Sequence, residues 1–580
     1  MSHAARTLPF VLAILVLLAL GAAALAQPQA MLARVAFLAG SIETRDWLMR
    51  GFGTGLLAVA LALWIEARWA SGSAVRLPLL ALVGLLSASF LLYCQQLAGW
   101  WIDDAGITFA YARSLAEGAG LTFQPGAPPT EGYSSSVWMA LLSLAHRAGL
   151  DIPQAAKYGG TALALGTLWI SLLWVWRTTE SAAAMALTAA AIGAAPTVVW
   201  AVSGQEHALQ ALLLLLAAFT AAHLRRWRLP VALLLAVLVW TRPETPLLVI
   251  AVFLAALFLS RADEGRLLFW RTLMLAAIPF AAFVGLMAFR MQYFGDPFPN
   301  PYHAKTSASS LAGLVNPFGG GWHYVWSGLQ DSGLLLLLPL ALIVGSGDSV
   351  PRRWVGFALL LGHGAFVIWA KGDWMGQYRF LMPVLPLIVV PAVLAIDHGF
   401  SVRARAWLCS ITAIALFAST LTEVDRFDAE PTTPLAVVSE IGRTFAQVAT
   451  RMGIADPVLA HHDAGAISYE RSIGLVDLGG LVDREVARNM ADADFLRTYI
   501  FDQKKPLFIF GARNFAAASG FLDGPELARD YVPLSFPNHP IMASDYSHIR
   551  RDAVQESPGI ELIRDATGTL TGVVVQSPDN

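Results

Sequence analysis

Two adjacent carboxylates are the first candidates for chemistry in this sequence. Asp103 and Asp104 follow Trp100 and Trp101 and begin a stretch with apolar residues at helical spacing. A carboxylate at a helix start is favoured by the free backbone N–H groups, but such a cap accounts for one Asp and not for two. At least one of the pair is therefore expected to meet a substrate, where it could take a proton from a hydroxyl group as a general base.

A phosphate-bearing substrate would also need cations. The candidate cations are Arg113, Arg242, His303, Lys305 and Arg379. Lys305 lies in FGDPFPNPYHAK and Arg379 in KGDWMGQYRF, among the Pro, Gly and aromatic residues typical of shaped loops. Asp373 precedes Arg379 with glycines nearby, so this segment can fold back and present a guanidinium, which suits phosphate oxygens.

Arg242 and Glu244 have two interpretations. They flank Pro243 in the segment TRPET, and the proline predicts a break between two short helices. The pair could form a structural ion pair or could bind substrate directly.

The sequence gives little support for a metal site or a cofactor. His461, His462 and Asp463 in AHHDAG have no distant partner in the sequence, and adjacent residues on a strand point to opposite faces, so we predict no metal there. The segment is instead interpreted as the end of a strand that leads into a glycine turn. Cys94 and Cys409 lie in apolar runs without the paired spacing of a zinc site or a disulfide. No cofactor is expected, although a requirement for a divalent cation stays open.

The composition places the elements that carry these residues in a membrane. Of 580 residues, 56% are hydrophobic and only 14% are charged, which ordinary soluble domains of this size do not show. The formal net charge of -2 gives no indication of a nucleic-acid partner. The lipid bilayer is the expected partner.

Apolar segments of spanning or near-spanning length predict about thirteen transmembrane helices. They lie near 8–26, 52–70, 77–97, 155–177, 181–201, 206–224, 229–241, 244–260, 270–290, 333–347, 354–370, 380–397 and 406–422. The first could be an uncleaved span or a signal segment, because Ala24, Leu25 and Ala26 resemble a signal-peptidase site.

Arginines distinguish the two sides of the membrane, because short cytoplasmic loops are enriched in positive charge. Those on the predicted cytoplasmic side are Arg68, Arg76, Arg177, Arg225, Arg226, Arg228, Arg261, Arg266, Arg352, Arg353, Arg403 and Arg405. The opposite connections, which include 98–154, 291–332 and 371–379, carry the candidate site residues. The protein is therefore expected in the inner (cell) membrane with its site outside the cytoplasm.

The composition changes after residue 422. Segments such as PVLAHHDAGAISYE and PLFIFGARNF predict short strands with helices between them, in a small C-terminal α/β domain on the periplasmic side. The predicted organisation is N-terminal transmembrane helices in 1–98, a first external loop in 99–154, a transmembrane core in 155–422 and the periplasmic domain in 423–580.

Several motifs resemble one family. In order, they are IDDAGITFAYARSLAEGAGLTFQPG with TEGYSSSVW, SGQEHALQALLLLL, TRPE, YFGDPFPNPYHAKTS, KGDWMGQYRFLMPVLPL and HDAGAISYERSIGLVDLGGLVDREVAR. Together they resemble the GT-C class of polyprenyl-phosphate-dependent glycosyltransferases, and within it the arabinofuranosyltransferase B type. The match to the GT-C architecture is more specific than the match to arabinose as the sugar.

The resemblance implies an α-helical polytopic membrane protein with a GT-C-like core. It implies a glycosyltransferase with Asp103 or Asp104 as catalytic base and with Glu131 and Tyr133 on the substrate face of the same loop. The implied partners are a polyprenyl-phosphate sugar donor and a glycan or glycoprotein acceptor. One departure is Gly106, where relatives often have a bulky aromatic residue, and we expect it to widen the acceptor cleft. Whether the reaction retains or inverts configuration stays open.

Two other functions remain possible on the sequence. A transporter or flippase of lipid-linked substrates would place ionisable groups within the membrane, often in two related halves, and no internal repeat is visible here. A non-catalytic assembly factor would leave the Asp103 and Asp104 pair without a role.

The charge bias predicts the topology directly. A single cysteine placed within 120–130, or after residue 430, should react with a membrane-impermeant thiol reagent in intact spheroplasts, whereas one beside Arg226 should not. The labelled fraction on a gel measures this. Labelling beside Arg226 alone would reverse the orientation.

Overall fold

The computed structural model describes residues 3–28, 46–69, 75–223, 228–263, 265–306, 320–336, 350–511, 520–537, 539–543 and 546–576. The chain forms two compact units. The helical unit comprises Met1–Gly99, Ala156–Val284 and Leu311–Thr432, and the mixed unit comprises Trp100–Ala155, Gly285–Ser310 and Thr433–Asn580. Each unit is described by itself.

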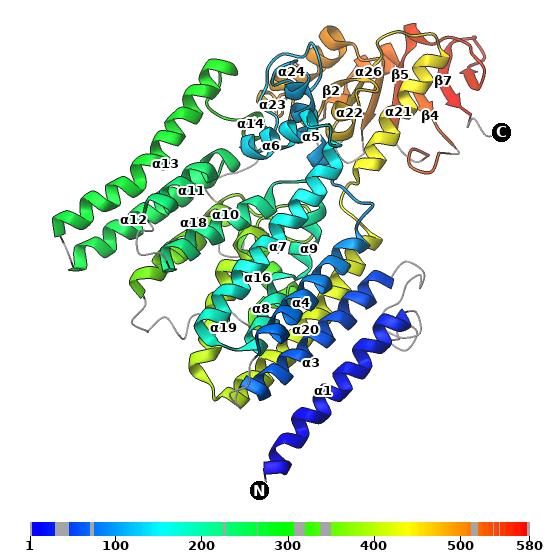
Figure 1. The fold of residues 1–580 in the computed structure, drawn as a ribbon. Coiled ribbons are helices and arrows are strands. Elements are labelled where there is room, and N and C mark those ends of the chain that lie inside the picture. The colour runs from blue at the N-terminus through cyan, green and yellow to red at the C-terminus, as the bar shows by residue number, and fades with distance from the viewer. Residues whose placement is uncertain are drawn as a thin grey trace. The chain divides into compact units, whose positions relative to one another are not determined.

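Helices build the helical unit. They are α1 (His3–Ala26), α3 (Asp46–Trp69), α4 (Arg76–Gln96), α7 (Ile152–Thr179), α8 (Ala182–Ile192), α9 (Ala195–Val202), α10 (His207–His223), α11 (Arg228–Thr241), α12 (Thr245–Asp263), α13 (Gly265–Tyr293), α16 (Gly320–Asp331), α18 (Val350–Trp369), α19 (Leu385–Gly399) and α20 (Val402–Ala429). Helix α3 packs against α1, α4 and α20, and α10 packs against α11 and α18 (Figure 1). The first turn of α7 and the end of α13 belong to the mixed unit.

The expected polytopic helical architecture is confirmed. Among the described residues, five helices are long and apolar enough to cross a membrane, or six if the pair α8 and α9 forms one span. Shorter apolar helices cover most of the other predicted segments. Most of the segment 333–347 lies outside the described residues. The number of about thirteen spans therefore stays a prediction.

The segment 181–201 is not the single helix that its apolar composition predicted. Helix α8 ends before Gly193, and α9 begins with Pro196 in its first turn. The two helices meet at 56°. Proline has no N–H to continue the hydrogen bonding of the preceding helix and is well accommodated in the first turn of a new one, so the chain bends at this point.

A seven-stranded sheet organises the C-terminal part of the mixed unit, which confirms the predicted α/β domain. Its strands are β1 (Val458–His461), β2 (Gly474–Asp477), β3 (Phe508–Gly511), β4 (Tyr531–Ser535), β5 (Tyr546–Arg550), β6 (Ile560–Arg564) and β7 (Leu570–Val575), in the order β2-β1-β3-β5-β4-β7-β6. Strand β1 is parallel to both β2 and β3. Ala460 and Ile509, both fully buried on these central strands, belong to the core of this region.

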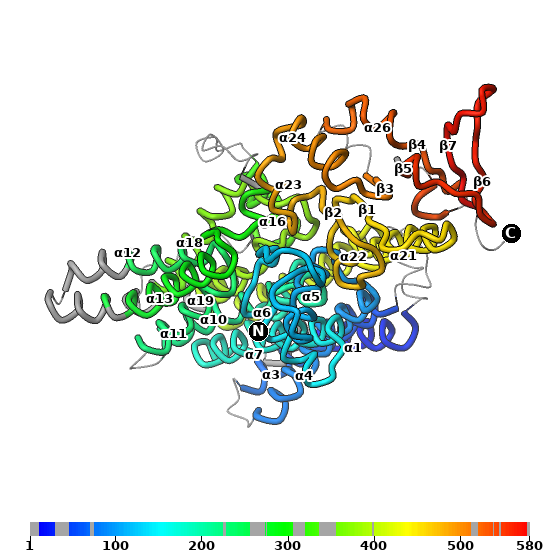
Figure 2. Tube along the Cα trace, turned by 90° about the horizontal axis from the view of Figure 1, so that it is seen from above, coloured from blue at the N-terminus to red at the C-terminus, as the bar shows by residue number. Residues whose placement is uncertain are grey.

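Short helices join the sheet to the rest of the mixed unit. They are α5 (Asp103–Ala116), α6 (Ser136–Arg147), α14 (Asn300–Thr306), α21 (Leu435–Arg451), α22 (Gly465–Glu470), α23 (Arg484–Arg488), α24 (Ala493–Arg497) and α26 (Pro525–Asp530). Helix α5 packs against α6, α21 and α22, as Figure 2 shows from above. Ile102 also forms a β-bridge with Pro434. The first loop and the C-terminal residues are therefore parts of one unit.

The sequence led us to expect that Gly106 widens an acceptor cleft, and this expectation is wrong. A Cβ atom built at Gly106 would lie 2.5 Å from the carbonyl carbon of Gly465 and 2.8 Å from a side-chain carbon of Leu435. The absence of a side chain instead allows α5 and α22 to make backbone contact. The position is filled by the neighbouring helix, so an aromatic residue could not fit without separating the two.

Gly106→Ala should therefore destabilise the protein by about 1 to 3 kcal/mol, because the overlap outweighs the gain of about 1 kcal/mol in helix propensity. Thermal unfolding of the detergent-solubilised protein measures the change. Gly84→Ala in α4 is the matched control, because nothing lies within 4 Å of its added Cβ. A Gly106→Ala protein as stable as the Gly84→Ala protein would contradict the packing described here.

Candidate functional site

Asp103 links the first loop to the C-terminal residues. Its two carboxylate oxygens accept hydrogen bonds from the backbone N–H groups of Gly465 and Ala466, at 2.9 and 2.8 Å. These N–H groups begin α22, so Asp103 starts one helix and caps another. The predicted capping role is thus found for one Asp of the pair, but at a helix far away in the sequence.

The environment of Asp103 differs from that of Asp104. Asp103 is only 3% exposed, and this burial is the main reason why the pKa of its carboxyl lies well above the usual range. Asp463 and, to a smaller extent, Asp104 raise this pKa further, whereas the two backbone hydrogen bonds lower it. Asp104 is partly exposed. The carboxylate of Asp103 is therefore engaged at the start of α22, and Asp104 is the more accessible of the two.

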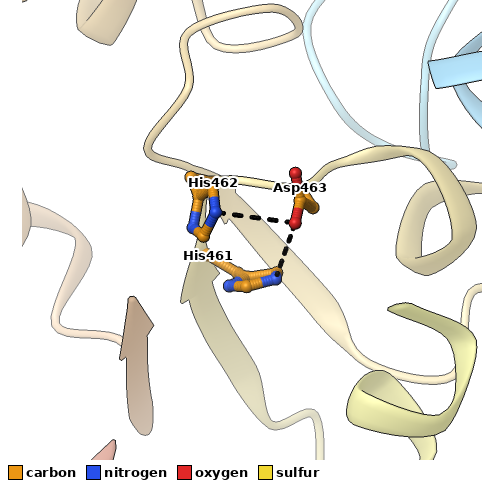
Figure 3. Close-up of side chains that lie close together, drawn as sticks. All are labelled: His461, His462 and Asp463. Carbon is orange, nitrogen blue, oxygen red and sulfur yellow. Dashed lines mark ion pairs between the residues drawn. The ribbon is translucent and has the colours of Figure 1, made fainter. Parts of the chain in front are cut away.

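Three more polar side chains converge nearby in the same unit. Asp463 Oδ2 lies 3.8 Å from His461 Nε2 and 3.5 Å from His462 Nε2 (Figure 3). The argument that adjacent strand residues must point apart was wrong here, because β1 ends at His461 and the chain turns before α22. His462 and Asp463 lie in that turn, where the alternation of a strand no longer applies.

The ring of His461 has a defined orientation. Nδ1 lies 2.8 Å from the carbonyl oxygen of Phe510 on β3, so Nδ1 carries the proton and donates it. Nε2 is buried and has no hydrogen-bond partner. Burial, together with His462, lowers the pKa of His461 to about 3, although the bond to Phe510 opposes this, so the imidazole is neutral at physiological pH.

Asp477 lies at the end of β2 beside the end of β1, and the sequence analysis did not identify it. It is paired in register with His461, and its carboxylate accepts hydrogen bonds from the N–H groups of Gly479 and Val482, at 2.8 and 2.7 Å. Burial raises the pKa of Asp477 to about 7. The sequence did contain an indication of this residue. In GLVDLGG, an aspartate follows a short apolar strand and lies shortly before two glycines.

Glu131 and Tyr133, expected on the substrate face of the first loop, are both buried. Glu131 forms a two-pronged ion pair with Arg290, whose nitrogens lie 2.7 and 3.0 Å from its oxygens. The ring of Tyr133 packs edge-on against Tyr111 at 5.0 Å. In this structure these residues hold the loop together, and Arg290 is a partner that the sequence analysis missed.

Two of the predicted cations of the mixed unit contact protein groups. Arg113 contacts Glu117 at 2.8 Å and donates to the carbonyl oxygen of Tyr469 on α22. His303 Nε2 lies 3.0 Å from Asp296, which also pairs with Arg488. The backbone of Lys305 is in α14, but its side chain lies outside the described residues.

The helical unit contains a separate cluster of buried charges. Arg242 pairs with Glu244 at 2.9 Å, as one of the two sequence interpretations expected, and with Glu206 at 2.6 Å. Arg379 pairs with Asp373 at 2.5 Å, so the segment does fold back on itself. Glu206, adjacent to His207 in SGQEH, is the member that the sequence analysis overlooked.

The predicted residues thus fall into two sets. Those in the mixed unit are Asp103, Asp104, Arg113, Glu131, Tyr133, His303 and Lys305. Those in the helical unit are Arg242, Glu244, Asp373 and Arg379. Within each set the structure brings distant parts of the sequence together.

Comparison with solved structures identifies the fold. ArnT from Cupriavidus metallidurans, solved bound to undecaprenyl phosphate, superposes with a TM-score of 0.51 over 82% of this chain and 98% of that chain, at 13% identity. The oligosaccharyltransferase AglB from Archaeoglobus fulgidus, in complex with an inhibitory peptide and a dolichol-phosphate, gives 0.44 over 83% and 71%, at 11% identity. The likeness to ArnT at this identity concerns the fold, and the GT-C fold that the motifs predicted is confirmed.

Sequence comparisons add less. Residues 435–556 match a family described as a domain of unknown function (DUF8728). No curated protein matches the sequence significantly. The arabinofuranosyltransferase B type is not distinguished by these comparisons.

The raised pKa of Asp477 predicts a pH dependence of stability. The unfolded carboxyl titrates near pH 3.9, so between about pH 4 and pH 7 the folded state holds the proton more tightly. This contribution to stability is present below pH 4 and is lost as the pH rises to 7, by up to about 4 kcal/mol. Asp477→Asn, which cannot ionise, should lack this decline.

Thermal unfolding across this pH range measures the difference between the two proteins. Asp502→Asn, which changes an exposed carboxyl of the same unit, is the control. Parallel pH profiles for wild type and Asp477→Asn would show that this carboxyl titrates normally.

Proposed function

We propose that this protein is a membrane glycosyltransferase that moves a sugar from a polyprenyl-phosphate donor to an envelope glycan or a surface protein. The observation that carries the proposal is the likeness in fold to ArnT over nearly the whole of that chain, since ArnT was solved with undecaprenyl phosphate. The carboxylate pair in the first loop adds the chemistry. Arabinofuranose is the proposed sugar, on the resemblance of the sequence motifs alone.

The proposed general base is Asp104. As an acceptor hydroxyl oxygen attacks the anomeric carbon of the sugar, Asp104 takes the hydroxyl proton, and the bond between that carbon and the phosphate oxygen breaks. Polyprenyl phosphate leaves with the bonding electrons. Asp103 supports this role by fixing the start of α5 against α22 through its two backbone hydrogen bonds.

The phosphate is proposed to bind a basic side chain, and the candidates are Arg379 of the helical unit and Lys305 of the mixed unit. Asp373 holds the Arg379 guanidinium on one edge, and Nη1 lies 3.5 Å from the side-chain oxygen of Gln205. Phosphate oxygens could replace the Gln205 contact without breaking the ion pair, and a fixed cation would stabilise the charge that develops on the leaving group. Arg242 and Glu244 are proposed to support this region from the adjoining helices.

The site is proposed to face the periplasm. Nucleotide sugars and ATP are scarce outside the cytoplasm, so a lipid-linked phosphosugar is the suitable donor there. The arginine bias of the opposite connections supports this orientation in the inner membrane.

A lipid flippase or transporter is the second candidate, and one observation favours it. Arg242, Glu206 and Glu244 are buried among the helices of the helical unit. Glu206 follows shortly after the bent pair α8 and α9 in the sequence. Buried ionisable groups and broken helices are features of transport pathways. The first-loop carboxylates have no role in that function.

Asp104→Asn should lower sugar transfer by about a hundredfold or more, because the amide cannot accept the hydroxyl proton. Transfer by the purified protein is measured with a polyprenyl-phosphate arabinofuranose donor, and then with donors extracted from native membranes. Asp151→Asn is the matched control, because Asp151 is an exposed carboxylate of the same loop that caps Gln154.

The same proteins separate the two candidate functions. Near-normal transfer by Asp104→Asn would exclude Asp104 as the base. A further variant, Glu206→Gln, tests the transporter. That function would be favoured if the protein moves a lipid-linked sugar across the membrane of liposomes without transferring it, and if this movement is abolished by Glu206→Gln but unaffected by Asp104→Asn.

A further inference from the structure

The carboxyl end of β1 is a favourable place for a ligand in this fold. After β1 the chain forms α22 and returns as β2 on one side, and then crosses to β3 on the other side of β1. All three strands are parallel. Ligands of open α/β sheets bind outside the carboxyl ends of strands where the strand order reverses in this way.

The side chains at this point have the chemistry of metal ligands. The ligand atoms of His461, His462 and Asp463 all lie within 4.8 Å of one another. Two of the separations are 3.5 and 3.8 Å, close to the roughly 3.4 Å between ligands around a tetrahedral zinc ion with bonds of about 2.0 to 2.1 Å. The separation between the two imidazole nitrogens is at most 4.8 Å, so the rings would close by up to about 1.4 Å for all three side chains to bind one ion.

His461 is already oriented as a metal ligand. It is 1% exposed, its Nδ1 donates to Phe510, and its buried Nε2 faces Asp463 without a hydrogen-bond partner (Figure 3). Histidine ligands of metals commonly donate their second ring nitrogen to a backbone carbonyl in this manner, which fixes the tautomer that binds the ion. An unpartnered ring nitrogen inside a protein is otherwise costly.

The other two ligands leave room for a further one. The side chains of His462 and Asp463 are 23% and 31% exposed, whereas that of His461 is enclosed. Three protein ligands with one accessible side resemble zinc sites that keep a position for water or substrate, rather than the closed four-ligand sites that only stabilise a fold.

We propose that His461, His462 and Asp463 bind one divalent transition-metal ion, with zinc as the best match to two imidazoles and one carboxylate. The ion occupies the switch point of the sheet and is held on the turn that leads into α22. Because Gly465, which begins α22, also bonds to Asp103, bound metal fixes the same turn that positions the first loop. Magnesium and calcium, which prefer oxygen ligands, are excluded by this donor set.

Metal binding to the full chain tests the proposal. The protein is purified in detergent, stripped with a chelator and titrated with zinc against a chromophoric chelator of known affinity. We expect one ion per chain, a rise in thermal stability on binding, and no competition from magnesium.

His462→Ala and Asp463→Asn should each weaken zinc binding by about 100-fold or more, since both are direct ligands and even changes outside the ligand set cost 10- to 100-fold. These two positions are partly exposed, so the variants should fold even if a change at the buried His461 does not. His146→Ala, a histidine of α6 in the same unit, is the control and should bind zinc normally.

Zinc affinity that is unchanged in both variants, or a wild-type protein that takes up no ion, would overturn the proposal. The readout is binding and not sugar transfer. Failure here would therefore leave the proposed role of Asp104 untouched, and failure of the transfer assay would leave the metal site untouched.

Discussion

The mixed unit depends on the contact between the Asp103 carboxylate and the first N–H groups of α22. The contact joins residues 362 positions apart in the chain, and both partners are buried. A buried carboxylate without hydrogen bonds would cost several kcal/mol of folding free energy. The first N–H groups of a helix have no partner within the helix and also need acceptors. Each group satisfies the other, and the missing side chains of Gly106 and Gly465 let the two backbones approach closely enough for it.

The same constraint explains why so many charged residues of this chain are paired. Three ion pairs have almost no exposed surface. They join Glu131 to Arg290, Arg242 to Glu206 and Arg242 to Glu244. Removing one partner of such a pair would leave a charge in an apolar environment, which is far more costly than an exposed ion pair is worth. Glu131 and Arg242, which the sequence offers as substrate ligands, are therefore engaged by protein groups in the fold.

Three partly exposed ionisable side chains of the mixed unit lie at the starts of two helices that pack together. Asp104 is partly exposed at the start of α5, and His462 and Asp463 are partly exposed just before α22. Burial is the main cause of the raised pKa of Asp103, and the neighbouring Asp463 and Asp104 add to it.

The sequence by itself determined the class of fold and most of the helical segments. Apolar length and the spacing of Asp, Pro and Gly are local properties, so they predicted the helices, the Arg242 and Glu244 pair and the turn between Asp373 and Arg379. Only the tertiary structure separated Asp103 from Asp104, filled the space beside Gly106 with α22, and brought His461, His462 and Asp463 together. These outcomes depend on which distant segments pack together and on the exact residue at which a strand ends. The spacing of apolar residues in a local segment predicts neither of them.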